Sequence, residues 1–135
     1  MELRDSYLWE VLIESDIVKS ILVYAQGIHP KEGILLLRGK VNRNSIKIND
    51  LWIPPQAIHG AGFSSFPIYR LPFDRSIIGT VHSHPSGSIK PSAVDLNHFY
   101  GGIMAIVCFP YASEEHIAFY NREGEQIPHR IIEVE

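Results

Sequence analysis

Two histidines one residue apart, with an aspartate eleven positions further on, are the residues of this chain best suited to chemistry. They are His82, His84 and Asp95. In a β-strand, residues i and i+2 project from the same face, so a strand would aim both imidazoles at one spot. Two imidazoles and a carboxylate, with a fourth position open to water, form a ligand set of catalytic zinc. The spacing of the two histidines alone leaves a purely structural role open for them.

The segments around these residues predict a strand, a turn and a helix. The run Ser76 to Val81 predicts a strand that ends with the two histidines, and Pro85 stops it. A turn through residues 86–88 follows. Ser92 is then expected as the N-cap of a helix with Asp95 at its third position, which is a capping box. Such a box forms with or without a metal, so this pattern by itself leaves the role of Asp95 open.

The whole string is more specific than its parts. His-x-His, seven residues, then Ser-x-x-Asp is matched by His82, His84, Ser92 and Asp95 with no gap or substitution. It resembles the signature of the JAMM (MPN+) zinc metalloproteases. The resemblance implies one Zn²⁺ per chain, held by the two histidines and the aspartate, and a serine that stabilises the oxyanion. It also implies an α+β fold, with a mixed, mostly antiparallel sheet flanked by helices.

A glutamate before a hydrophobic strand extends the resemblance. JAMM proteins place their catalytic glutamate there, often as Pro-x-Glu-x-x-Gly-x-Leu. Residues 30–35 read Pro-Lys-Glu-Gly-Ile-Leu, so the glycine comes early, directly after Glu32. The resemblance implies that Glu32 is the general base, and Glu14 is the nearest competitor. Spacing alone would also allow Glu32 to be an ordinary solvated loop residue.

The resemblance implies a reaction as well as a site. JAMM enzymes hydrolyse amide bonds at the C-terminal Gly-Gly of ubiquitin or ubiquitin-like proteins, so a deubiquitinase-like or desampylase-like isopeptidase is expected. Only Leu96 to Gly102 separates the predicted aspartate helix from the next strand. This interval lacks the insertion of the linkage-selective members, so the chain looks like the single-domain archaeal and bacterial ones, which act on ubiquitin-like or sulfur-carrier proteins.

Two other functions stay open. One is a hydrolase that trims a C-terminal amino acid from a sulfur-carrier protein with the same zinc site. The other is a non-catalytic MPN scaffold, although such scaffolds lose zinc ligands that this chain keeps.

The stretch Gly62 to Phe73 is a candidate for partner binding. It holds the aromatics Phe63, Phe66, Tyr69 and Phe73 among glycine, proline and serine residues. JAMM members carry a partner-contacting insertion at this point, just before the zinc strand. A flap that binds the ubiquitin-like partner and a long loop folded onto the core are both consistent with the sequence.

Length and charge restrict the class of protein. The 135 residues fit a single domain, 1–135, and the net charge of −3 argues against a nucleic-acid or membrane-surface binder. No apolar run approaches a membrane span, and the first residues lack the pattern of a signal peptide. With one cysteine, Cys108, placed in an apolar run, a buried thiol in a cytoplasmic enzyme is expected. The sequence leaves a monomer and a homo-oligomer equally open.

Periodicity predicts the remaining elements. A first strand is expected over Tyr7 to Ile13, then a helix that Ser15 or Asp16 caps, that runs to Gln26 and that has Gly27 directly after its end. The second helix is expected to continue to Tyr100. Further strands are expected over residues 34–39, 45–51 and 103–109, with a closing hairpin over 116–127 and a tail, 130–135, that pairs at an edge or frays.

Overall fold

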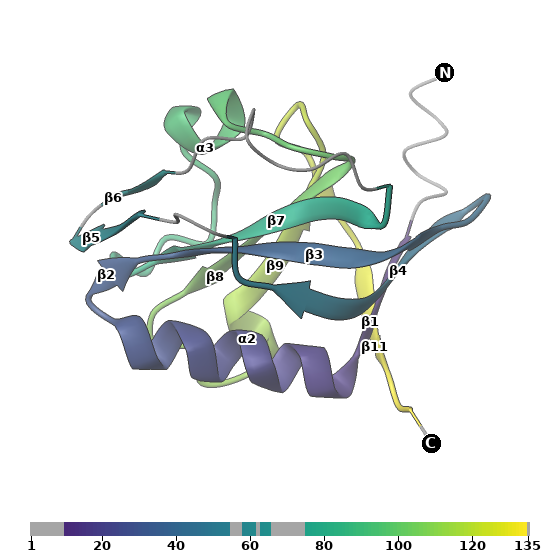
Figure 1. Ribbon diagram of the computed structural model, residues 1–135, viewed down its shortest axis with the longest axis horizontal. Coiled ribbons are helices and arrows are strands. Elements are labelled where there is room, and N and C mark those ends of the chain that lie inside the picture. The colour runs from purple at the N-terminus through teal and green to yellow at the C-terminus, as the bar shows by residue number, and fades with distance from the viewer. Residues whose placement is uncertain (1–9, 55–57, 62, 66–74, 135) are drawn as a thin grey trace.

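The computed structural model describes residues 10–54, 58–61, 63–65 and 75–134. An eight-stranded sheet has the order β10-β9-β8-β7-β3-β4-β1-β11, and a smaller antiparallel sheet has the order β2-β5-β6. Helix α2 lies along one face of the large sheet, and helix α3 lies on its other side (Figure 1). The strands of the large sheet are β1 (Glu10–Glu14), β3 (Ile34–Val41), β4 (Ser45–Trp52), β7 (Ile77–His84), β8 (Ile103–Cys108), β9 (Ile117–Tyr120), β10 (Gln126–Ile127) and β11 (His129–Ile132).

The other elements are short except for α2. They are α2 (Ser15–Ile28), β2 (Lys31–Glu32), β5 (Ile58–Ala61), β6 (Phe63–Ser65), α3 (Ala93–Asn97) and the 3₁₀ turn η2 (Glu114–His116). In the large sheet, β1 runs parallel to β4 and β11, and β7 runs parallel to β8, while the other neighbours are antiparallel. The predicted α+β class with a mixed, mostly antiparallel sheet is therefore confirmed.

Helix α2 is held by apolar burial. Val18, Ile21 and Ala25 are buried on its inner stripe. Its predicted ends are wrong. The helix follows β1 directly, with Glu14 as an N-cap that makes no side-chain capping bond, and it continues through Gly27 to Ile28. Tertiary packing explains the two extra residues, because the Ile28 side chain lies against Gly33, the residue that links β2 to β3.

The two faces of the sheet carry separate cores. On β8, Ile103, Ala105 and Val107 belong to the core under α2, whereas Met104 and Ile106 pack with Phe99 on the other side. This alternation is the period of two that a strand imposes. The second face is also the more polar one. Of the buried polar residues of the described chain, Thr80, His82 and His84 of β7 and Asp95 of α3 lie on this side, whereas Ser83 alternates with the histidines and lies on the side of α2.

Helix α3 is shorter than predicted, because it ends at Asn97 rather than at Tyr100. The N–H of His98 bonds to the Asp95 carbonyl and that of Phe99 to the Leu96 carbonyl, which are the tight i→i−3 bonds of a final turn. Phe99 then turns inward and is buried in the second core. At Gly101, φ is +81°, a conformation that favours glycine, and the chain turns there into β8.

The C-terminal tail forms an edge strand over His129–Ile132, where β11 pairs in parallel with β1 over Val11 to Glu14. The described part of the first strand, β1, runs from Glu10 to Glu14, one residue beyond its expected end, and Tyr7 to Trp9 lie outside the described residues. Within the described chain, neither helix has the length and hydropathy needed to cross a membrane.

Candidate metal centre

Strand β7 presents both histidines on one face. His82 and His84 are two residues apart at the end of the strand, and they are 4% and 8% exposed. The strand is buried because β3 flanks it on one side, with Ile34 opposite His82, and β8 on the other, with Cys108 opposite His84. The pair is therefore fixed by two neighbouring strands.

Helix α3 brings in the carboxylate through its cap. Ser92 is the N-cap in extended conformation, and its Oγ accepts a hydrogen bond from the Asp95 N–H at 3.0 Å. In return, Asp95 Oδ2 accepts one from the Ser92 N–H at 2.7 Å. The predicted capping box is thus confirmed. It holds the Asp95 side chain, which is 6% exposed, against the histidine strand.

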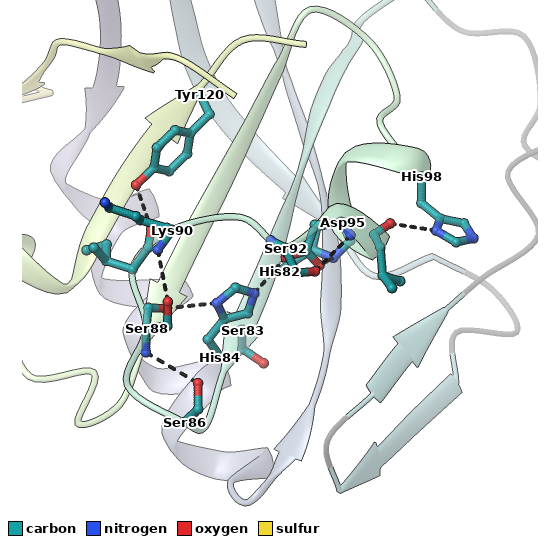
Figure 2. A network of polar contacts seen from close by, with 12 residues as sticks. His82, Ser83, His84, Ser86, Ser88, Lys90, Ser92, Asp95, His98 and Tyr120 are labelled. Atoms are coloured by element: carbon teal, nitrogen blue, oxygen red, sulfur yellow. Dashed lines mark hydrogen bonds and ion pairs between the residues drawn. The ribbon is translucent and has the colours of Figure 1, made fainter. Parts of the chain in front are cut away.

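One carboxylate contacts both imidazole rings (Figure 2). Asp95 Oδ1 lies 3.3 Å from His82 Nδ1, and Asp95 Oδ2 lies 2.9 Å from His84 Nε2. The structure therefore brings together the three side chains that the sequence singled out, from a strand end and a helix start.

The second nitrogen of His84 fixes how this ring faces the aspartate. Its Nδ1 lies 2.8 Å from the Ser88 carbonyl oxygen, which can only accept, so Nδ1 carries the proton (Figure 2). In the neutral ring, Nε2 then directs a lone pair at the Asp95 carboxylate. Two acceptors in this position require a positive charge between them, either a proton on Nε2 or a metal ion. An N–H donated to a backbone carbonyl is also the usual support of a metal-bound histidine.

The electrostatics keep the aspartate ionised. Burial by itself raises the pKa of Asp95, but the hydrogen bonds from His82, His84 and the Ser92 N–H outweigh it and hold the pKa far below its ordinary value. For His84, burial lowers the pKa. The hydrogen bond to Asp95, the charge of Asp95, the Ser88 carbonyl and the charge of Glu32 together raise that pKa above its usual value.

The donor set fits zinc. Among the described residues, no group of three or more His, Cys, Asp or Glu side chains is already arranged to hold a metal ion, and Asp95 bonds directly to the two rings. However, within the part of the chain that the structure describes, His82 Nε2 is buried without a hydrogen-bond partner, which is costly for a polar atom. Two imidazoles and an ionised carboxylate match a catalytic zinc site with one open position. His82, His84 and Asp95 would thus hold the ion.

Glu32 lies in the same region of the molecule. It ends the short strand β2, where it pairs with Gly60 of β5, and it is partly buried. Its negative charge contributes to the raised pKa values of His84 and Tyr111, although burial is the largest influence on each. The residue that follows it, Gly33, is hydrogen-bonded to Ser83, which stands between the two histidines.

Three supporting contacts could not be predicted from sequence patterns. The Ser88 carbonyl that orients His84 belongs to a turn, and the Tyr120 hydroxyl donates to the Ile89 carbonyl at 2.6 Å, which holds the loop between the ligands. Ser83 Oγ accepts a hydrogen bond from the Gly33 N–H at 2.8 Å. The only sequence signal for Ser83 is its place between the two histidines.

Two further histidines, His29 and His98, have partners other than Asp95. His29 Nδ1 lies 2.9 Å from the Tyr111 hydroxyl, and its ring stacks on Phe109. His98 is exposed at the end of α3, and Cys108 is buried, as expected. Of the stretch 62–73, only the backbone of β6 (Phe63–Ser65) is described, so Phe66, Tyr69 and Phe73 lie outside the described residues.

Comparisons with known proteins agree with this geometry. Residues 14–122 match the model of the prokaryotic homologues of the JAB domain. A Haloferax volcanii protein named "probable metalloprotease" is 30% identical over 120 aligned residues, and the match covers 84% of this chain and 74% of that protein.

Two solved structures share both fold and sequence with the chain. A JAB1/MPN domain protein from Archaeoglobus fulgidus is 35% identical with a TM-score of 0.64, and the match covers 89% of this chain and 97% of that one. A structure described as JAMM, a metalloprotease-like zinc site in the proteasome and signalosome, is 32% identical with a TM-score of 0.67, over 90% and 97% of the two chains. The chain therefore belongs to the prokaryotic JAB-domain family, whose fold is that of the JAMM/MPN proteins.

Proposed function

We propose that this protein is a zinc-dependent peptidase that hydrolyses the amide bond after the C-terminal Gly-Gly of a ubiquitin-like protein. The observation that carries the proposal is the single buried carboxylate, Asp95, bonded to both His82 and His84 and anchored by the Ser92 cap. The scaffold alternative loses support, because every residue of the signature is present and the three side chains are in contact.

Each residue has a defined task in the proposed reaction. A bound zinc ion would supply a Lewis acid and a water of lowered pKa. Glu32 accepts the proton of the attacking water and passes it to the departing amine, a contribution of about 10²–10⁴ in rate. The Ser92 hydroxyl accepts from the Asp95 N–H, and its own proton stays available for the negative oxygen that develops on the substrate. Loss of such a donor costs about 10²–10³ in kcat.

The partner segment is part of the same proposal. Gly62 to Phe73 would bind the ubiquitin-like protein through its aromatic side chains, since interface residues with large effects are often aromatic. Phe66→Ala should weaken cleavage of a protein conjugate at least tenfold and spare hydrolysis of a short Gly-Gly peptide. Rates on the two substrates and a thermal melt test this. A fall in stability that matches the fall in activity would assign Phe66 to the core.

The direct experiment is incubation of the zinc-loaded protein with conjugates of ubiquitin-like proteins, followed by mass analysis of the products. Release of the intact modifier ending in Gly-Gly supports the proposal, whereas loss of one C-terminal residue from a sulfur-carrier protein would support the trimming reaction. Glu32→Gln is the matched control, because it keeps the shape of the side chain and removes the proton acceptor. A folded, zinc-bound Glu32→Gln protein that keeps more than about a tenth of the activity would place the base elsewhere, and Glu14 would be tested next.

A further inference from the structure

Ser83 stands between the two histidines, and its hydroxyl is bonded to a different strand. The Gly33 N–H donates to Ser83 Oγ at 2.8 Å, and the Ser83 N–H donates to the Gly33 carbonyl at 3.1 Å. Ser83 is 1% exposed, so water does not compete for these bonds. A residue of the histidine strand therefore holds the peptide that directly follows Glu32.

The bond to the hydroxyl replaces a ladder bond. The pairing of β3 with β7 ends at Ile34 opposite His82. One step further, a regular hydrogen-bonded antiparallel pair would join both N–H groups to backbone carbonyls. Here the Gly33 N–H donates to the side-chain oxygen of Ser83 instead. The serine hydroxyl thus sets the point at which the chain leaves the ladder on its way back to Glu32.

Helix α2 confines Gly33 from a different direction. A Cβ at Gly33 would lie 2.2 Å from Ile28 Cδ1 and 2.4 Å from the Tyr24 hydroxyl oxygen. The same hydroxyl donates to the Ile34 carbonyl at 3.5 Å. Gly33 is therefore fitted between the end of α2 and strand β7, and it has no room to move toward the helix.

We propose that Ser83 is a positioning residue for Glu32, because its hydroxyl fixes the Gly33 peptide relative to the strand that carries His82 and His84. This rests on the proposed function in taking Glu32 as the general base. Correct placement matters because a displacement of about 1 Å at a reacting group can cost about 10² in rate. One side chain then sets the geometry between the base and the ligand pair.

The first test is Ser83→Ala in the zinc-loaded enzyme. We expect kcat to fall at least tenfold, KM and zinc content to stay within twofold, and the Gly33 amide to exchange with solvent faster in an NMR measurement. Ser83→Thr keeps the hydroxyl and should recover most of the rate. Thr80→Val is the matched control, since it removes another buried hydroxyl of β7, one that has no hydrogen-bond partner among the described residues. It should leave kcat unchanged.

A double-mutant cycle separates positioning from a general structural role. In a Glu32→Gln background, Ser83→Ala should cost less than twofold, because the group that it positions is gone. Equal losses in both backgrounds would overturn the proposal. The proposal would also be overturned if Ser83→Ala kept more than half of the wild-type kcat while its Gly33 amide exchanged freely. A loss of kcat in Thr80→Val as large as that in Ser83→Ala would overturn it as well. Full activity of Glu32→Gln would instead remove the proposed base, while the exchange of the Gly33 amide would still report on the Ser83 bond.

Discussion

The two helices of this domain are held in place by different interactions. α2 (Ser15–Ile28) makes no side-chain capping bond, and it buries Val18, Ile21 and Ala25 in the main core. α3 (Ala93–Asn97) has only Asp95 buried, and a capping box fixes that residue. Apolar packing is non-directional, so it places a whole element, whereas paired hydrogen bonds aim one side chain.

The two helices support the candidate site in different ways. α2 ends four residues before Glu32 and supports the Gly33 peptide through Ile28 and Tyr24. α3 begins beside the site and directs the Asp95 carboxylate at two rings. Truncation of a buried apolar side chain of α2 should therefore lower the stability of the fold and spare metal binding, whereas loss of the Asp95 carboxylate of α3 should abolish metal binding with a smaller loss of stability.

The largest effect is expected from Asp95. Asp95→Ala removes a proposed ligand and half of the capping box, so the protein should lose its stoichiometric zinc and its activity. Asp95→Asn keeps an acceptor for the Ser92 N–H but loses the charge, so it should also fail to hold zinc while its stability stays closer to that of the wild type. Metal analysis with a thermal melt tests both variants. A folded His82/His84/Asp95 triple alanine variant with one zinc per chain would contradict the ligand assignment.

Ile21→Ala tests the other side of the comparison. Ile21 is fully buried in the core under α2, and truncation of such a residue costs about 2–5 kcal/mol of unfolding free energy. Zinc per folded chain should be unchanged. Val23→Ala is the control on the same helix, because Val23 is 65% exposed and a surface change costs within about 0.5 kcal/mol. Denaturant unfolding of both variants measures the difference, and loss of zinc from folded Ile21→Ala would break the distinction between the helices.

Ser92→Ala should have a smaller effect on stability. It removes the acceptor for the Asp95 N–H, and loss of an N-cap costs about 1 kcal/mol. The Ser92 N–H still reaches the carboxylate, so zinc should remain bound. Ser92→Thr keeps the cap and serves as the control in the same unfolding and metal measurements. If Ser92→Ala loses zinc at full stability, the hydroxyl supports the ligand rather than the helix.

Local patterns were enough to predict the cluster. The alternation of a strand puts His82 and His84 on one face, and the capping box at Ser92 and Asp95 depends on residues only three apart. Such features follow from neighbouring residues, so one sequence shows them. The strands over residues 34–41, 45–52 and 103–108 were found for the same reason, since each is a short apolar or alternating run.

Features that depend on distant residues escaped prediction. Ser83 and Gly33 are 50 positions apart, and no local pattern joins a serine hydroxyl to a glycine amide. The predicted ends of both helices were wrong for the same reason. α2 continues to Ile28 where that side chain packs on Gly33, and α3 stops early where Phe99 turns into the second core. Glycine chemistry suggested an end at Gly27, but tertiary packing decided it.

The smallest prediction concerns this misjudged end. Gly27 is exposed within the last turn of α2, and a Cβ built on it meets no atom within 4 Å. Gly27→Ala should therefore stabilise the protein by about 0.5 kcal/mol, because alanine loses less backbone entropy than glycine on entering a helix. Denaturant unfolding, with zinc content as the unaffected control, measures this. If Gly27 were instead the left-handed residue beyond the helix, alanine would be strained there and would destabilise the protein by about 1 kcal/mol. The sign of the change in unfolding free energy thus decides whether α2 continues through Gly27 to Ile28.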